Sequence, residues 1–201
     1  MLMLCAILIP ILGGMLLLPR QSEDRRARQR YVLAVSCLTS VLALGAVYTG
    51  LGEEPLVLLR LNSHLSVAFR VDGLTALFAV MVSLLWPLAC LYALEYMSRE
   101  GREDRFFAFY LAAFGVTLGV AFSANILTMY FFYELLTLTT LPLVMHARDG
   151  KARYAGRVYL IYSMSGTALG FISMVFLLQY GGGPFVLGGI LSGTGAGPDL
   201  L

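Results

Sequence analysis

Long apolar blocks alternate with short polar links along the chain. Six blocks each approach the roughly 20 residues that span a bilayer core of about 30 Å, and they cover residues 1–19, 31–51, 71–97, 106–122, 125–145 and 155–180. Only Ser123 and Ala124 separate the fourth block from the fifth, so these two helices must be antiparallel neighbours. The pattern predicts an all-α fold, a polytopic membrane helical bundle of about six transmembrane helices.

The two ends of the chain differ from its middle. No basic residue precedes the apolar block at 1–19, and a basic cluster follows it, which is the opposite of the order in a cleaved signal peptide. We therefore interpret this block as the first transmembrane helix. The Gly-rich run after Tyr180 has no spanning pattern. Together these features predict a single transmembrane domain over residues 1–201.

Composition and charge placement support this prediction and orient the chain. Only 13% of the residues are charged, against about 25% in a typical soluble domain. With the N-terminus outside, the cytoplasmic links hold 12 of the 14 basic residues, as the positive-inside rule requires. Those twelve are Arg20, Arg25, Arg26, Arg28, Arg30, Arg99, Arg102, Arg105, Arg148, Lys151, Arg153 and Arg157. Only Arg60 and Arg70 are left outside.

Residues that bind metals or cofactors are sparse. The three cysteines, Cys5, Cys37 and Cys90, lie within apolar blocks, and we interpret them as small core hydrophobes. The chain has only two histidines, His64 and His146, and no carboxylate cluster beside either. No nucleotide-binding or catalytic triad motif is present. We expect no metal, no cofactor, no redox chemistry of the chain's own and no nucleic-acid partner.

Pairs of glycines four residues apart suggest how the helices pack. Gly115 and Gly119 form one pair, and Gly166 and Gly170 form another. Small residues at this spacing let helix backbones approach closely in a membrane. We expect these faces to join the fourth, fifth and sixth helices. The sixth-helix face, with Tyr159, Ser163, Gly166, Thr167 and Gly170, has the alternative of lining a hydrated path.

Glu134 is the charged residue that the pattern places deep in a predicted span. It follows Asn125 by nine residues and precedes Met145 by eleven, so a rise of about 1.5 Å per residue puts it near mid-membrane. An acid at that depth costs roughly 2.5–3.5 kcal/mol. The residues one turn away include no cation: they are Tyr130, Phe131, Thr137 and Leu138.

The environment of Glu134 favours the protonated carboxyl unless a cation arrives from elsewhere. Such an acid is suited to taking up and releasing a proton, and Glu134 is the candidate proton-relay residue. The alternative is a neutral carboxyl that bonds a neighbouring helix. Among the other charges, we expect Asp72 to cap the third helix with Arg70 as a partner, and Glu95 to reach the membrane interface.

Two segments resemble a known family. RVDGLTALF at 70–78 and, more specifically, YELLTLTTLPLV at 133–144 resemble the antiporter-like, proton-conducting membrane subunits. These occur in respiratory complex I, in multisubunit sodium/proton antiporters and in membrane-bound hydrogenase or formate hydrogenlyase complexes. The similarity covers most of residues 70–175, whereas the first two helices match in hydropathy alone.

The resemblance implies a role for Glu134 and a longer parent protein. In that family the glutamate of the fifth-helix motif pairs with a lysine on a seventh helix. Here the only lysine is Lys151, in a predicted link, and the sequence ends at Leu201. Family members usually have about fourteen helices in two inverted repeats. We therefore expect an incomplete chain or a split subunit, corresponding to the N-terminal part of the family.

Two functions follow from this resemblance. The leading one is a proton-translocating subunit, or its N-terminal part, of a multisubunit complex such as NADH:quinone oxidoreductase, with Glu134 as the proton site. The alternative is a non-conducting structural membrane subunit of such a complex. The expected partners are other membrane subunits, a peripheral redox arm and the lipid bilayer, in a bacterial or archaeal inner membrane.

Overall fold

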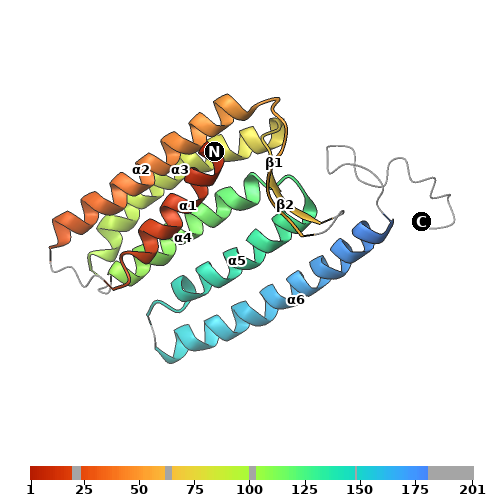
Figure 1. Cartoon of the computed structure of the whole chain (residues 1–201). Coiled ribbons are helices and arrows are strands. Elements are labelled where there is room, and N and C mark those ends of the chain that lie inside the picture. The colour runs from red at the N-terminus through yellow and green to blue at the C-terminus, as the bar shows by residue number, and fades with distance from the viewer. Residues whose placement is uncertain (20–23, 62–64, 100–102, 148, 181–201) are drawn as a thin grey trace.

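The computed structural model describes residues 1–19, 24–61, 65–99, 103–147 and 149–180. Within them, six helices form a bundle and a two-stranded sheet covers one end of it (Figure 1). The helices are α1 (Leu2–Met15), α2 (Arg25–Gly50), α3 (Gly73–Met97), α4 (Glu103–Ala121), α5 (Ile126–Val144) and α6 (Gly150–Tyr180). The strands are β1 (Leu56–Arg60) and β2 (Ser66–Phe69). The predicted membrane helical bundle is confirmed, and the chain is a multi-pass membrane protein.

The helix ends differ from the predicted spans. Helices α2 to α6 are long and apolar enough to cross a membrane, whereas α1 has only 14 residues, or about 21 Å at 1.5 Å per residue. The first predicted span, 1–19, corresponds to this shorter helix and the turn that follows it. The chain tightens after Met15, where the Leu17 amide bonds to the Gly14 carbonyl at 3.0 Å, and Pro19 has no amide hydrogen with which to continue a helix.

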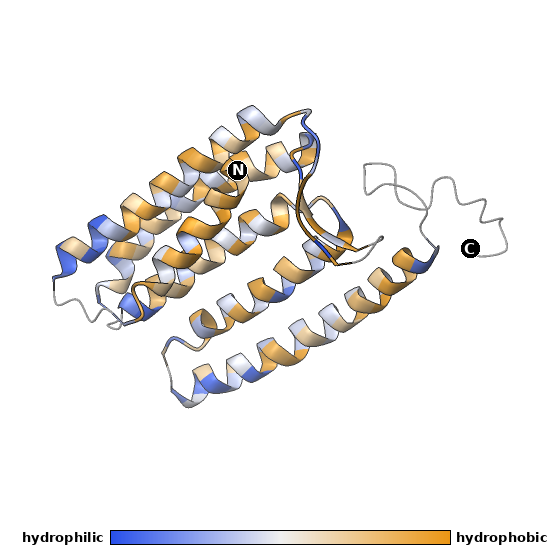
Figure 2. Ribbon diagram, viewed as in Figure 1, coloured by the Kyte–Doolittle hydropathy of each residue, from blue (hydrophilic) through white to orange (hydrophobic). Residues whose placement is uncertain are grey.

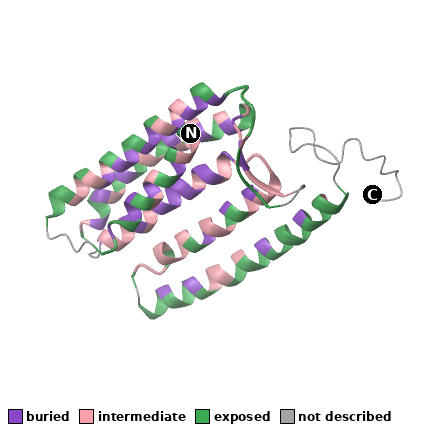
Figure 3. Ribbon diagram, viewed as in Figure 1, coloured by how far each residue is buried: buried purple, intermediate pink, exposed green. Residues whose placement is uncertain are grey.

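Helix α4 lies at the centre of the bundle. It packs against α1, α2, α3 and α5, and it is buried along most of its length, in contrast to α6 (Figure 3). Its closest neighbour is α1. A Cβ atom added to Gly14 would collide with the carbonyl oxygen of Ala108, and one added to Gly115 would collide with that of Ile7. Glycine at both positions lets the two backbones touch.

The predicted glycine seam is only partly correct. Gly119 faces the ring of Phe132, so α4 and α5 pack as predicted, but Gly115 faces α1. Gly166 and Gly170 on α6 face open space among the described residues. The seam through these two glycines is therefore wrong, because spacing places residues on one helix face without saying which neighbour covers it. Helix α6 does pack on α5, and its buried residues there are Ala152, Gly156, Thr167 and Met174.

The segment predicted as a loop between the second and third helices contains a β-hairpin. Strands β1 and β2 pair antiparallel, with Leu56 opposite Phe69 and an irregularity between Val57 and Leu59. In the sequence, two short apolar runs on either side of Asn62 were the available signal. Apolar runs of four or five residues do not separate a strand from irregular chain by pattern alone.

Strand β2 is fixed to the link between α4 and α5. The Arg70 amide bonds to the Phe122 carbonyl at 2.8 Å, and the Ala124 amide bonds to the Ala68 carbonyl at 2.9 Å. Asn125 caps α5 by accepting from the Thr128 amide, and its side-chain amide donates to the Ser66 carbonyl at 2.7 Å. The hairpin therefore fixes the start of α5, the helix that carries Glu134.

The two ends of the bundle differ in charge (Figure 2). The described basic residues of the three predicted cytoplasmic links gather at the end where α2, α4 and α6 begin, and Arg60 and Arg70 lie at the hairpin end. This separation agrees with the predicted distribution. Three of the predicted basic residues, Arg20, Arg102 and Arg148, lie outside the described residues, as does the Gly-rich run 181–201.

An ion-pair cluster joins the charged ends of α2 and α4. The Arg28 Nη2 atom lies 2.8 Å from the Glu103 Oε2 atom, and Nη1 lies 3.3 Å from the Asp104 Oδ1 atom. Arg28 and Glu103 are almost fully buried. Both acids occupy the first turn of α4, where the positive end of the helix dipole also favours them. The cluster therefore sets the spacing of the two helices at this end.

Asp72 caps α3, as predicted. Its carboxylate accepts from the Thr75 amide at 2.8 Å and from the Arg70 guanidinium at 3.3 Å. The pKa of Asp72 is lowered mainly by the Thr75 amide; partial burial opposes this effect, and Arg70 adds to it. A carboxyl with a lowered folded-state pKa stabilises the protein above its unfolded-state pKa, and that contribution is lost as pH falls through the folded-state pKa.

We expect Asp72→Ala to lower the free energy of unfolding by about 1 kcal/mol at neutral pH, the usual effect of losing an N-cap. The difference from wild type should shrink as pH falls through the lowered pKa of Asp72, because the wild-type carboxylate is then protonated. Thermal unfolding across the acidic range measures this. Asp72→Asn is the control, because it keeps a capping oxygen without the titration. A difference that persists undiminished in acid would contradict the assignment.

Candidate functional site

Glu134 lies beside the middle of the 19-residue helix α5 and is partly buried. Its Oε1 atom accepts a hydrogen bond from the Tyr130 hydroxyl at 2.7 Å. Thr137 is also buried, but its hydroxyl donates to the Tyr133 carbonyl at 3.5 Å. Glu134 is thus held by one oriented donor four residues earlier on its own helix.

The sequence leaves two interpretations of Glu134, a proton-relay residue and a neutral carboxyl that bonds a neighbouring helix. Its contacts in the structure bear on both. The ion pairs among the described residues involve Arg28 and Arg70, and neither arginine pairs with Glu134. A carboxyl that joins helices needs a partner on another helix, whereas the bond from Tyr130 lies within α5. Among the described residues, the recorded partner of the carboxyl is therefore a residue of its own helix.

Hydroxyl groups continue from Glu134 along the contact between α5 and α6. The Thr140 and Tyr159 hydroxyls are hydrogen-bonded at 2.6 Å, and the rings of Tyr130 and Phe171 lie 5.8 Å apart. These two contacts fix the antiparallel register, so Ser163 is level with Thr137. Hydroxyls both donate and accept hydrogen bonds, and the bonded Thr140–Tyr159 pair lies between Glu134 and the basic end of the bundle.

The sequence pattern predicts only part of this set of hydroxyls. Helical spacing places Tyr159 and Ser163 on one face of α6 but indicates no role for Thr140, which follows Thr137 by three residues on the same side of α5. The spacing of Tyr130, Glu134, Thr137 and Thr140 was the available signal. The α6 partner of each α5 residue required the helix register, which only the structure gives.

The remaining candidate ligands do not converge. No group of three or more His, Cys, Asp or Glu side chains that could hold a metal occurs in the described part of the chain. The His146 ring packs edge-on against Phe106 at 5.5 Å. Cys90 is buried as predicted, whereas Cys5 and Cys37 are exposed on the bundle surface. The prediction of core cysteines is therefore wrong for those two.

Comparison with known families and proteins gives consistent matches. The family described as NADH-Ubiquinone oxidoreductase (complex I), chain 5 N-terminus, matches residues 59–107. A probable K(+)/H(+) antiporter subunit of Rhizobium meliloti (strain 1021) is 28% identical over 181 residues, which are 85% of this chain. An Na(+)/H(+) antiporter subunit of Staphylococcus aureus is 28% identical over 140 residues, or 68% of the chain. The chain spans only 18% of the length of either relative.

Two solved structures share the fold. A chain of the membrane-bound sulfane sulfur reductase, an archaeal respiratory membrane complex, superposes with a TM-score of 0.71 at 14% identity, over 89% of this chain and 37% of that one. A chain of respiratory complex I from Thermus thermophilus gives a TM-score of 0.65 at 24% identity, over 83% of this chain and 33% of that one. The helical arrangement around Glu134 is therefore one that membrane subunits of respiratory complexes also adopt.

Proposed function

We propose that this chain is the proton-translocating part of a multisubunit respiratory or antiport complex. Its similarity to antiporter subunits and to the N-terminal part of a complex I chain supports this proposal. In this proposal Glu134 is the group that takes up and releases the proton. The observation that carries it is the partly buried carboxyl near the middle of α5, whose recorded hydrogen-bond partner among the described residues is the Tyr130 hydroxyl.

The mechanism uses two states of one carboxyl. In one state the Tyr130 hydroxyl holds the carboxyl in place. When a cation approaches from a segment beyond the described residues, the charged form becomes favourable and the proton leaves. The resemblance implies a lysine as this cation. Because the relatives are more than five times longer than this chain's match to them, we place that lysine in a later segment or in a neighbouring subunit.

We also propose that the proton reaches Glu134 along the hydroxyls of the α5–α6 contact. Thr137, Thr140 and Tyr159 lie between Glu134 and the basic end of the bundle. With the N-terminus outside, that end faces the cytoplasm by the positive-inside rule. Proton access from the cytoplasm along the α5–α6 contact is therefore part of the proposal, in the inner membrane of a bacterium or archaeon. A peripheral redox arm is the partner that would drive transport in a respiratory complex.

The test is proton movement by the complete complex in sealed vesicles, followed with a pH-sensitive dye and combined with a hydrophobic carbodiimide, which modifies protonated carboxyls in apolar surroundings. We expect the reagent to inhibit transport and peptide mapping to find it on Glu134. Inhibition should follow the fraction of Glu134 modified. Full inhibition while Glu134 remains unmodified would place the proton site on another residue.

A further inference from the structure

One exposed stripe of α3 changes in character along its length. Met81, Leu85, Leu88, Tyr92 and Tyr96 recur every three or four residues and so share one side of the helix. All five are at least half exposed. The stripe is aliphatic near the middle of α3 and aromatic near its end, and Glu95 and Arg99 add charge beside its last turn.

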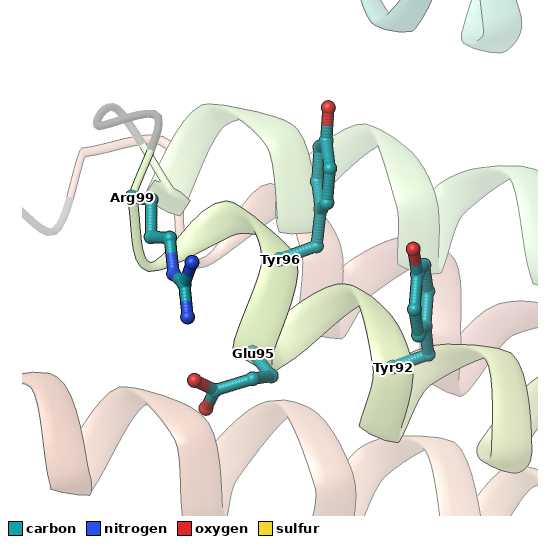
Figure 4. A pocket seen from close by; sticks show the side chains of 4 residues that line it. All are labelled: Tyr92, Glu95, Tyr96 and Arg99. Atoms are coloured by element: carbon teal, nitrogen blue, oxygen red, sulfur yellow. The ribbon is translucent and has the colours of Figure 1, made fainter.

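The end of this stripe forms a small hollow. Tyr92, Glu95, Tyr96 and Arg99 line it (Figure 4). The two tyrosine rings are stacked, with centroids 6.2 Å apart and planes 21° apart. Figure 4 shows the tyrosines pointing to the same side, while the Glu95 carboxylate and the Arg99 guanidinium face a common space at the helix end. The hollow therefore offers an anionic and a cationic group beside two tyrosine rings, whose hydroxyls point away from those charges.

Within the described part of the chain, Glu95 and Arg99 do not form an ion pair with each other. Glu95 lies in the last turn of α3 and Arg99 follows the C-cap residue Ser98, so both side chains extend from the same end of the helix. The ion pairs recorded among the described residues do not include them. A ligand that carries both a positive and a negative charge would satisfy both groups. A ligand with a single charge would leave one of the two groups without a counter-charge.

The position of the hollow identifies the kind of ligand. Helix α3 has 25 residues, or about 37 Å at 1.5 Å per residue, so its last turns extend beyond a hydrocarbon core of about 30 Å. They do so at the basic end of the bundle. Tyrosine is enriched at the level of lipid head groups. The aliphatic part of the stripe then lies at the depth of the acyl chains.

We propose that this stripe binds a phospholipid with a phosphoethanolamine head group. Arg99 binds the phosphate through charge-assisted hydrogen bonds, and Glu95 accepts hydrogen bonds from the primary ammonium. The Tyr92 and Tyr96 hydroxyls lie at the glycerol level, and one acyl chain follows Leu88, Leu85 and Met81. A trimethylated ammonium cannot donate to Glu95, and a phosphoglycerol head group leaves that carboxylate without a cation.

The experiment uses the chain purified from its membrane with the subunits that remain bound, after removal of native lipid. Lipids with phosphoethanolamine, phosphocholine or phosphoglycerol head groups and identical acyl chains are added, and binding is measured by native mass spectrometry and thermal shift. We expect the phosphoethanolamine lipid to bind about tenfold more tightly than either of the others. Equal binding of all three, or preference for phosphoglycerol, would overturn the proposal.

Variants separate this site from general lipid contact. Glu95→Gln should abolish the preference for phosphoethanolamine over phosphocholine, whereas Arg99→Gln should weaken both by about tenfold. Arg153→Gln, which removes an exposed arginine at the same end of the bundle, is the matched control and should leave binding unchanged. A photo-cross-linker at position 96 tests the competing occupant. Cross-linking to a neighbouring protein subunit, with no lipid retained, would show a protein interface and overturn the proposal.

Discussion

Replacing Glu134 by Gln is expected to lower proton transport by the complete complex by about 100-fold or more while complex assembly stays unchanged. The loss is the lower end of the effect of removing a group that gives and takes a proton. Gln keeps the length of the side chain and an oxygen that can still accept from Tyr130. The initial rate of acidification in sealed vesicles measures the effect, normalised to the amount of complex.

Two further variants make this result specific. Glu134→Asp keeps the acid one methylene shorter and should retain partial transport, because titration persists while its reach to the Tyr130 hydroxyl is lost. Tyr133→Phe removes an exposed hydroxyl next to Glu134 in the sequence and should leave transport near wild type. Full activity of Glu134→Gln at normal expression would make Glu134 a structural hydrogen bonder and favour the non-conducting subunit.

The features that sequence could predict are those set by local chemistry. The long apolar blocks predicted six helices, five of which are long enough to span a membrane, because a backbone in lipid must bond within its own segment. Asp72 was correctly predicted as a cap because the capping bond reaches only Thr75, three residues away. The bond from Tyr130 to Glu134 likewise follows from helical spacing of four residues. None of these requires knowledge of a second helix.

The features that sequence missed depend on contacts between distant segments. Strand β2 is held by the start of α5, some sixty residues later, through Thr128 and the N-cap residue Asn125. The bond between Thr140 and Tyr159 depends on the register of two helices. Likewise, both glycine pairs have the same spacing, yet one is covered and the other is open among the described residues. Spacing alone carries no information on the neighbour.

Replacing Gly115 by Leu is expected to destabilise the chain by about 3 kcal/mol or more, at the upper end of the usual cost of overpacking. The first side-chain atom would meet the backbone carbonyl of Ile7, with Pro10 and Ile11 of α1 also within 3 Å. A backbone atom cannot swing aside as a side chain can, so α1 must move away from α4. The buried cluster around Phe114 and Ile7 would open with it.

Gly166→Leu is the matched control, because it makes the same change on α6 where an added Cβ meets no described atom within 4 Å. Both variants gain the same helix propensity, which is worth somewhat under 1 kcal/mol when Leu replaces Gly. The difference between them therefore reports packing alone. Thermal unfolding in detergent and the yield of folded protein measure it. Similar unfolding of the two variants would mean that α1 does not pack on α4 through Gly115, and a larger loss for Gly166→Leu would place the tight helix contact on α6.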